Sequence, residues 1–137
     1  MIPTRISSSD AVRNLREIKN SPASLVCAVV ILFVQWLVTL AGGYHQEPAW
    51  GWFEMLGLSQ EGIRSARFWQ IFTYGFLHGG WLHVGLNALL VIFIGSRIER
   101  VLGNTAMLKT LIGGIIGGGL LHFLSTLNSQ NAPLLVG

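Results

Sequence analysis

The chain has 137 residues, of which 51% are hydrophobic and only 11% are charged, and this composition excludes an ordinary soluble domain. Its nine Lys and Arg residues give a formal net charge of +3. They are spread over separate loops and form no aromatic-interleaved basic stripe, so we expect a lipid bilayer and no nucleic acid as partner. The single cysteine, Cys27, excludes a disulfide within the chain.

Residues 1–22 are polar, and we expect a cytoplasmic tail with one short helix over residues 10–19. The apolar run that follows predicts a first span over about 23–42. A cleaved signal peptide is the alternative for this region, but its apolar core is usually only about 7–15 residues long. We therefore interpret the run as a retained membrane span.

The connection over residues 44–67 is long and holds an unusual number of large apolar side chains. Tryptophan rings favour the membrane interface, whereas three glutamates in the same stretch favour water. The stretch is therefore either a segment lying in the outer membrane interface or an aromatic belt that anchors neighbouring helices. The side chains concerned are Trp50, Trp52, Phe53, Met55, Leu56, Leu58, Glu47, Glu54 and Glu61.

The second apolar interval is broken by Gly79-Gly80, and we expect the second span at about 78–96, with its helix beginning near Trp81. A helix from Trp81 to Ser96 would measure roughly 24 Å at about 1.5 Å per residue, which is short for a complete crossing. The third span is expected at about 106–127. Overlapping G-x-x-x-G pairs along one of its faces permit the close approach of another helix: Gly113, Gly114, Gly117, Gly118 and Gly119. Residues 128–132 read as an outer loop.

The distribution of basic residues predicts the orientation of the spans. Four precede the first span, three flank the turn between the second and third spans, and two lie in the first loop: Arg5, Arg13, Arg16 and Lys19; Arg97, Arg100 and Lys109; Arg64 and Arg67. Because Lys and Arg concentrate on the cytoplasmic side, we expect a multi-pass integral membrane protein with a cytoplasmic N-terminus.

Three polar residues at membrane depth are candidates for function, namely His78, His83 and Asn87. His83 and Asn87 are four residues apart and therefore share a helix face, and His78 can fold back toward them if the helix begins near Trp81. Two neutral donors that converge on one point stabilise negative charge developing on an oxygen. Interhelical hydrogen bonding is the structural alternative, and we favour it for His122. Ligation of a metal or haem by His78 or His83 together with His122 is a third possibility that the spacing does not require.

The residues from Phe68 to His83, F-W-Q-I-F-T-Y-G-F-L-H-G-G-W-L-H, resemble the rhomboid intramembrane serine proteases. The pattern His78, four residues, His83, three residues, Asn87 continues to Gly95, Glu99 and Gly103, as in that family. The resemblance covers roughly residues 67–119, and more loosely the first loop and the first span. One departure is Trp69-Gln70 where many members have Trp-Arg, which leaves any role of that arginine without a counterpart.

The resemblance implies an all-α transmembrane bundle of six helices, of which three spans are present here. It also implies a nucleophilic serine in a G-x-S-G motif at the start of the fourth helix and a general-base histidine on the sixth. The 137 residues contain neither, and Gly137 matches the first glycine of that motif. Ser96, Ser125 and Ser129 lack the setting of an activated nucleophile. The residues that carry over are His83 and Asn87 as oxyanion donors, with His78 as a lesser contributor, and neither a cofactor nor a metal is implied.

We therefore interpret residues 23–137 as a partial rhomboid-like membrane domain, the N-terminal part of an endopeptidase that cleaves transmembrane protein substrates. On this interpretation the polar face of the second span and the glycine face of the third would lack partners, so we expect aggregation or oligomerisation of the isolated chain. A non-catalytic relative that binds transmembrane segments is the second interpretation, and a membrane scaffold is the third.

Overall fold

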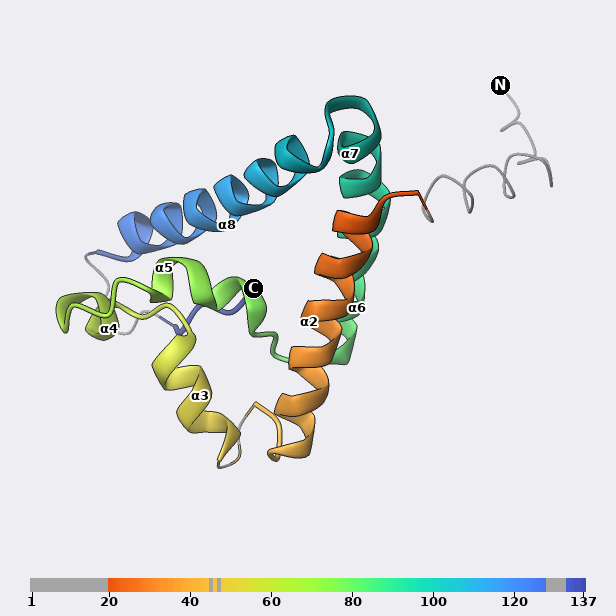
Figure 1. The fold of residues 1–137 in the computed structure, drawn as a ribbon. Helices are drawn as coiled ribbons and strands as arrows, with labels where there is room; N and C mark the ends of the chain where they lie inside the picture. The colour runs from red at the N-terminus through yellow and green to blue at the C-terminus, as the bar shows by residue number, and fades with distance from the viewer. Residues whose placement is uncertain (1–19, 45, 47, 128–132) are drawn as a thin grey trace, which may run out of the picture.

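The computed structural model describes residues 20–44, 46, 48–127 and 133–137, and the predicted helix at 10–19 and loop at 128–132 both lie outside them. The described part is helical, as expected, with three helices long and apolar enough to cross a membrane. These are α2 (Pro22–Leu40), the continuous run α6 (Trp81–Leu90), η2 (Val91–Gly95) and α7 (Ser96–Leu102), and α8 (Asn104–Thr126). Figure 1 shows α2 alongside α6, with α8 leading away from α7.

The second long helix differs from its expected bounds of 78–96. It begins at Trp81, as the glycine pair predicts, but it continues through one π-helical turn to Leu102 and so has 22 residues. The expected end at Ser96 was wrong because charged residues end the apolar stretch without ending the helix. The helix stops at Gly103, whose φ of +86° suits glycine.

Glu99 on α7 joins the second helix to the start of the first. The Glu99 carboxylate accepts hydrogen bonds from the Ala23 N–H at 2.9 Å, the Ser24 N–H at 2.8 Å and the Ser24 hydroxyl at 2.7 Å. N–H groups in the first turn of a helix have no partner within the helix, and negative charge is favourable there. A Cβ at Gly95 would lie 3.0 Å from Ser24 Oγ. Glu99 therefore holds the start of α2 against the second helix, and Gly95 permits their close approach.

The connection after α2 folds into short helices that build part of the core. These are α3 (Ala49–Leu56), α4 (Gln60–Arg64), α5 (Gln70–Thr73) and the 3₁₀ turn η1 (Tyr74–Phe76). Ala49 and Phe53 are fully buried against Val38 of α2 and Leu77. Burial of a phenylalanine contributes about 1.5–3 kcal/mol, so this connection is a packed element. Its placement in the membrane interface stays a prediction.

The glycine face of α8 is occupied in part by Tyr74. The Tyr74 hydroxyl donates a hydrogen bond of 2.6 Å to the Ile115 carbonyl. A Cβ at Gly119 would lie 2.9 Å from the Tyr74 ring, and one at Gly118 would lie 3.0 Å from its hydroxyl. Gly118 and Gly119 thus allow the short α5–η1 segment to pack closely against α8. A Cβ at Gly113, Gly114 or Gly117 would meet nothing within 4 Å.

Candidate functional site

His78 lies in the loop between η1 and α6 and is only 2% exposed. The chain extends at Leu77 and again at Gly80, so the loop can turn back before α6 begins. The His78 ring lies 5.2 Å from the His83 ring, centroid to centroid, at an interplanar angle of 76°. The structure therefore brings together two histidines that a continuous helix would have separated.

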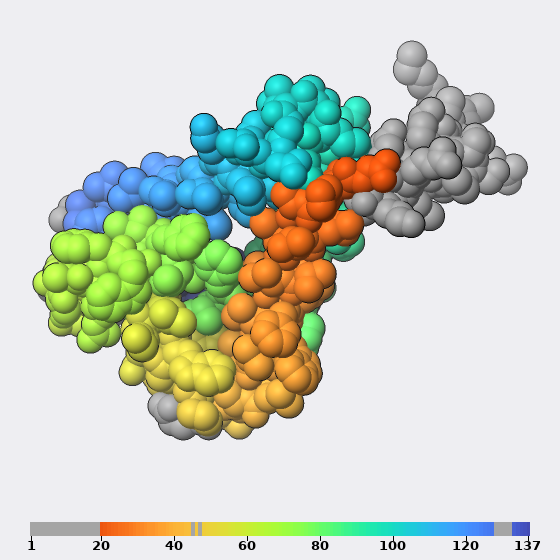
Figure 2. Space-filling view, in the orientation of Figure 1, coloured from red at the N-terminus to blue at the C-terminus, as the bar shows by residue number. Residues whose placement is uncertain are grey.

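His83 and Asn87 lie one turn apart on α6, His83 exposed and Asn87 half-buried. Asn87 and His78 both line a groove of about 740 Å³ that is otherwise mostly apolar. Figure 2 shows the molecule hollowed between α2 in orange and the α5–η1 segment in green. His83 does not line the groove, but its ring contacts the ring of His78, which does.

The segment ending at Gly137 docks directly on the wall of this groove. The Gly137 N–H donates to the Tyr74 carbonyl at 2.9 Å and to the Leu77 carbonyl at 2.8 Å, and Leu135 exchanges backbone hydrogen bonds with Leu58. A Cβ at Gly137 would lie 2.7 Å from the Gly75 carbonyl oxygen, so only glycine permits this approach. Gly137 itself lines the groove together with His78 and Asn87.

The electrostatic environment keeps His78 neutral. Burial, and to a lesser extent the charge interaction with His83, lower the pKa of His78 from its ordinary value of 6.5 to about 4, although a hydrogen bond with the Phe76 backbone opposes both effects. A neutral imidazole carries one N–H donor and one acceptor. His78 can thus contribute a hydrogen bond near neutral pH without contributing a charge.

The described serines considered as alternative nucleophiles are engaged with their own helices. The Ser96 hydroxyl donates to the Ile92 carbonyl, and the Ser125 hydroxyl donates to the His122 carbonyl at 2.8 Å. Ser129 lies outside the described residues. The described part of the chain also contains no group of three or more His, Cys, Asp or Glu side chains able to hold a metal ion.

Two buried glutamines were not singled out from the sequence. Gln70 is fully buried; its amide donates to the Glu54 carbonyl at 3.0 Å and accepts from the Ser59 N–H at 3.2 Å. The residue noted only as a departure from Trp-Arg therefore joins α3 and α4 to α5. Gln35, on α2, is 4% exposed. Gln35 could have been identified as a polar residue inside an apolar run, which is how His83 was identified.

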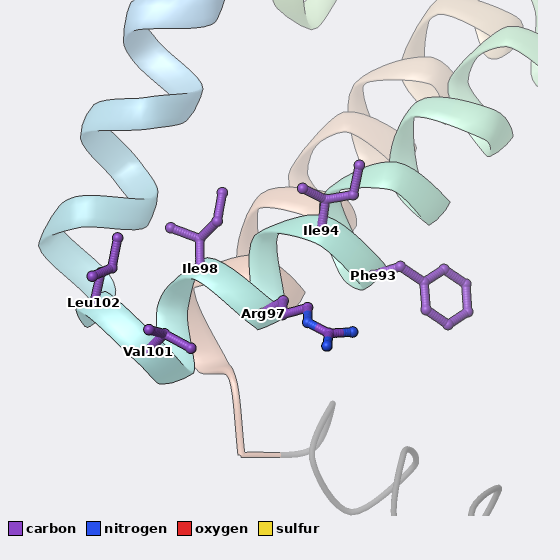
Figure 3. Close-up of a pocket in the computed structure, with 6 residues that line it drawn as sticks. All are labelled: Phe93, Ile94, Arg97, Ile98, Val101 and Leu102. Carbon is purple, nitrogen blue, oxygen red and sulfur yellow. The ribbon is translucent and has the colours of Figure 1, made fainter.

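A second hollow, of about 500 Å³, lies along the C-terminal half of the second long helix. Figure 3 shows its side chains projecting from η2 and α7. The described residues that line it are Phe93, Ile94, Arg97, Ile98, Val101 and Leu102. Arg97 is the single polar side chain among them, so this hollow lacks the groups needed for acid–base or nucleophilic chemistry.

Comparison with curated proteins finds several of similar sequence. The human Rhomboid-related protein 3 is 36% identical over 55 residues, which are 40% of this chain and 14% of that protein. Rhomboid-like protein 16, chloroplastic, of Arabidopsis thaliana is 35% identical over 69 residues, 50% of this chain and 21% of that protein. Rhomboid-like protein 15 of the same plant is 27% identical over 96 residues, 70% of this chain and 23% of that protein.

The chain thus spans less than a quarter of the length of these curated relatives. A comparison with solved structures finds no match. The model of the Rhomboid domain family matches residues 65–137, which are more than half of the chain and include the loop histidine, both α6 candidates and the groove residue Gly137. The chain therefore belongs to the rhomboid family.

Proposed function

We propose that this chain contributes the oxyanion-stabilising part of an intramembrane serine endopeptidase that cleaves transmembrane protein substrates. His83 and Asn87 are the principal donors to the tetrahedral intermediate, and His78 is a lesser contributor. A serine nucleophile and a general-base histidine complete such a site, and the proposal assigns neither role to a residue of this sequence.

The observation that carries the proposal is that His78 lies beside His83 and shares one groove with Asn87. The rings of His78 and His83 are 5.2 Å apart, and Asn87 shares the groove with His78. Fixed neutral donors in a mostly apolar setting stabilise a developing oxyanion more strongly than water does, because they need no reorientation as the charge forms. A site built only to hold helices together has no need of three such groups on one side.

The proposed orientation places the N-terminus in the cytoplasm, which follows from the basic residues that precede α2 and flank the α7–α8 turn. The loop with His78 then lies at the outer side of the membrane. Substrates would accordingly be cut near the outer ends of their transmembrane segments.

The test uses the complete open reading frame that carries these residues, expressed in membranes with a panel of tagged transmembrane substrates. The unmodified protein should cleave a substrate and react with a serine-directed fluorophosphonate. His83→Ala and Asn87→Ala should each lower kcat by about 10²–10³-fold, as loss of one oxyanion donor does elsewhere, while probe labelling in the membrane shows that the variants are folded. His122→Ala, on α8, is the control and should retain full activity.

Two results would contradict the proposal. Unchanged cleavage by the His83→Ala and Asn87→Ala variants would remove these residues from the chemistry. Absence of both cleavage and probe labelling in the complete protein would exclude an active serine protease.

The second candidate function is non-catalytic binding of transmembrane segments. The mostly apolar lining of the groove favours it, because such walls suit an apolar helix at least as well as a cleavage site does. Crosslinking of a substrate segment to the groove without cleavage, in the same panel, would support this candidate over the first.

A further inference from the structure

The hollow along η2 and α7 is an exposed apolar surface with a single cation in it. Phe93 is 60% exposed, Ile94 is 56% exposed and Val101 is 75% exposed, so the described chain covers little of this surface. Arg97 is the one charged side chain among the residues that line the hollow. A contiguous apolar patch of this kind marks a surface that contacts lipid or another protein.

Arg97 lies within the apolar patch and not at its margin. Phe93, Arg97 and Val101 follow one another at intervals of four residues and therefore share a helix face. Figure 3 shows the Arg97 side chain between the other two. An arginine can lay its methylene stem along apolar surface while its guanidinium group remains at a polar boundary. The hollow therefore combines an apolar wall with a cationic group.

The positive charge of Arg97 is not neutralised by a carboxylate of the same region. Glu99 is the one acidic residue in the stretch 96–109, and its carboxylate accepts hydrogen bonds from the N–H and the hydroxyl of Ser24 on α2. Arg100 interacts electrostatically with that same carboxylate. Within the described part of the chain, Arg97 forms no hydrogen bond or ion pair. Its charge is therefore available to an external anion.

The position of Arg97 along the helix suits a lipid phosphate. It directly follows the interval 68–96, which contains no Asp, Glu, Lys or Arg. It also lies five residues, or about 8 Å, before the end of the 22-residue helix, so its long side chain can reach the headgroups. Arg100 and Lys109 add positive charge on either side of the turn that follows. A basic site at the end of a span favours an anionic lipid.

We propose that this hollow binds one anionic phospholipid, with its phosphate at the Arg97 guanidinium and an acyl chain along Phe93 and Ile94. A phospholipid joins an anionic phosphate to apolar chains, and the hollow offers a complement to both parts. Phe93 and Ile94 lie on the side of Arg97 toward the middle of the helix, which is the direction that an acyl chain takes from its headgroup. The site requires neither the proposed proteolysis nor a particular orientation of the spans, because both membrane surfaces carry phosphates.

The test is native mass spectrometry of the protein encoded by the complete open reading frame, titrated in detergent with phosphatidylglycerol or phosphatidylcholine of identical acyl chains. The first phosphatidylglycerol should bind about fivefold more tightly than phosphatidylcholine, which is the factor that one basic side chain contributes near an anionic headgroup. Arg97→Gln should remove this preference. Arg64→Gln, which removes an exposed arginine at the end of α4, should keep it. Equal binding of the two lipids by the unmodified protein, or an unchanged preference in Arg97→Gln, would overturn the proposal.

A second pair of variants tests the apolar wall. Phe93→Ala removes a 60% exposed ring beside Arg97, and Phe33→Ala removes a 54% exposed ring on α2, outside the hollow. Phe93→Ala should weaken the binding of both lipids by about fivefold, because it removes apolar contact with the acyl chain. Phe33→Ala should keep the affinities of the unmodified protein. Equal affinities of the two variants would refute the assigned wall, and because no cleavage is measured, this result is separate from that of the protease test.

Discussion

The hydrogen bonds of Glu99 to the first turn of α2 give the sharpest stability prediction. Glu99→Ala removes the acceptor for two backbone N–H groups and the Ser24 hydroxyl. A hydrogen bond to a charged group is worth about 1.5–3 kcal/mol, and donors left buried and unpaired carry an additional penalty. Because some relaxation and water entry follow, we expect a loss of about 4 kcal/mol in the free energy of unfolding. Glu99→Gln keeps one oxygen acceptor and should lose about 2 kcal/mol.

The measurement is equilibrium unfolding of the chain in mixed micelles, with the helical signal followed as denaturing detergent is added. Glu61→Gln is the matched control, because the Glu61 carboxylate is exposed and accepts a hydrogen bond from the Ser65 hydroxyl one turn away. Such a surface contact contributes less than about 0.5 kcal/mol. If the free energies of unfolding of Glu99→Gln and Glu61→Gln agree within about 0.5 kcal/mol, the proposed anchoring of α2 by Glu99 is wrong.

Two further predictions concern the glycine face and His78. Gly119→Ala should destabilise the protein by about 1–3 kcal/mol, because the new Cβ would lie 2.9 Å from the Tyr74 ring. Gly117→Ala, whose Cβ meets nothing within 4 Å, should be neutral or stabilising by up to about 1 kcal/mol in the same unfolding assay, and equal losses in the two variants would contradict the packing. Since the pKa of His78 is lowered from 6.5 to about 4, the stability gained by keeping it neutral is fully present above pH 6.5 and is lost as the pH falls toward 4. An NMR titration should find His78 still neutral at pH 5, and half-protonation near pH 6.5 in the folded protein would contradict its burial.

The sequence by itself determined the helical class, the three candidate membrane-spanning helices and the shared face of His83 and Asn87. Each of these follows from local spacing, because an uncharged interval long enough to cross a bilayer and a separation of four residues are both readable along the chain. The same reasoning found the start of α6 at Trp81, directly after Gly79-Gly80.

Only the tertiary structure decided which polar residues are buried and what they bind. Glu99 and Ser24 are 75 residues apart in sequence, yet the Ser24 hydroxyl oxygen lies 2.7 Å from a carboxylate oxygen of Glu99. The Gln70 amide donates to the Glu54 carbonyl, a pairing that no sequence spacing predicts. Tyr74 on the glycine face is a further case. The physical reason is that a hydrogen-bond or packing partner is chosen by the folded path of the chain, whereas local patterns report only which face of a helix a residue occupies.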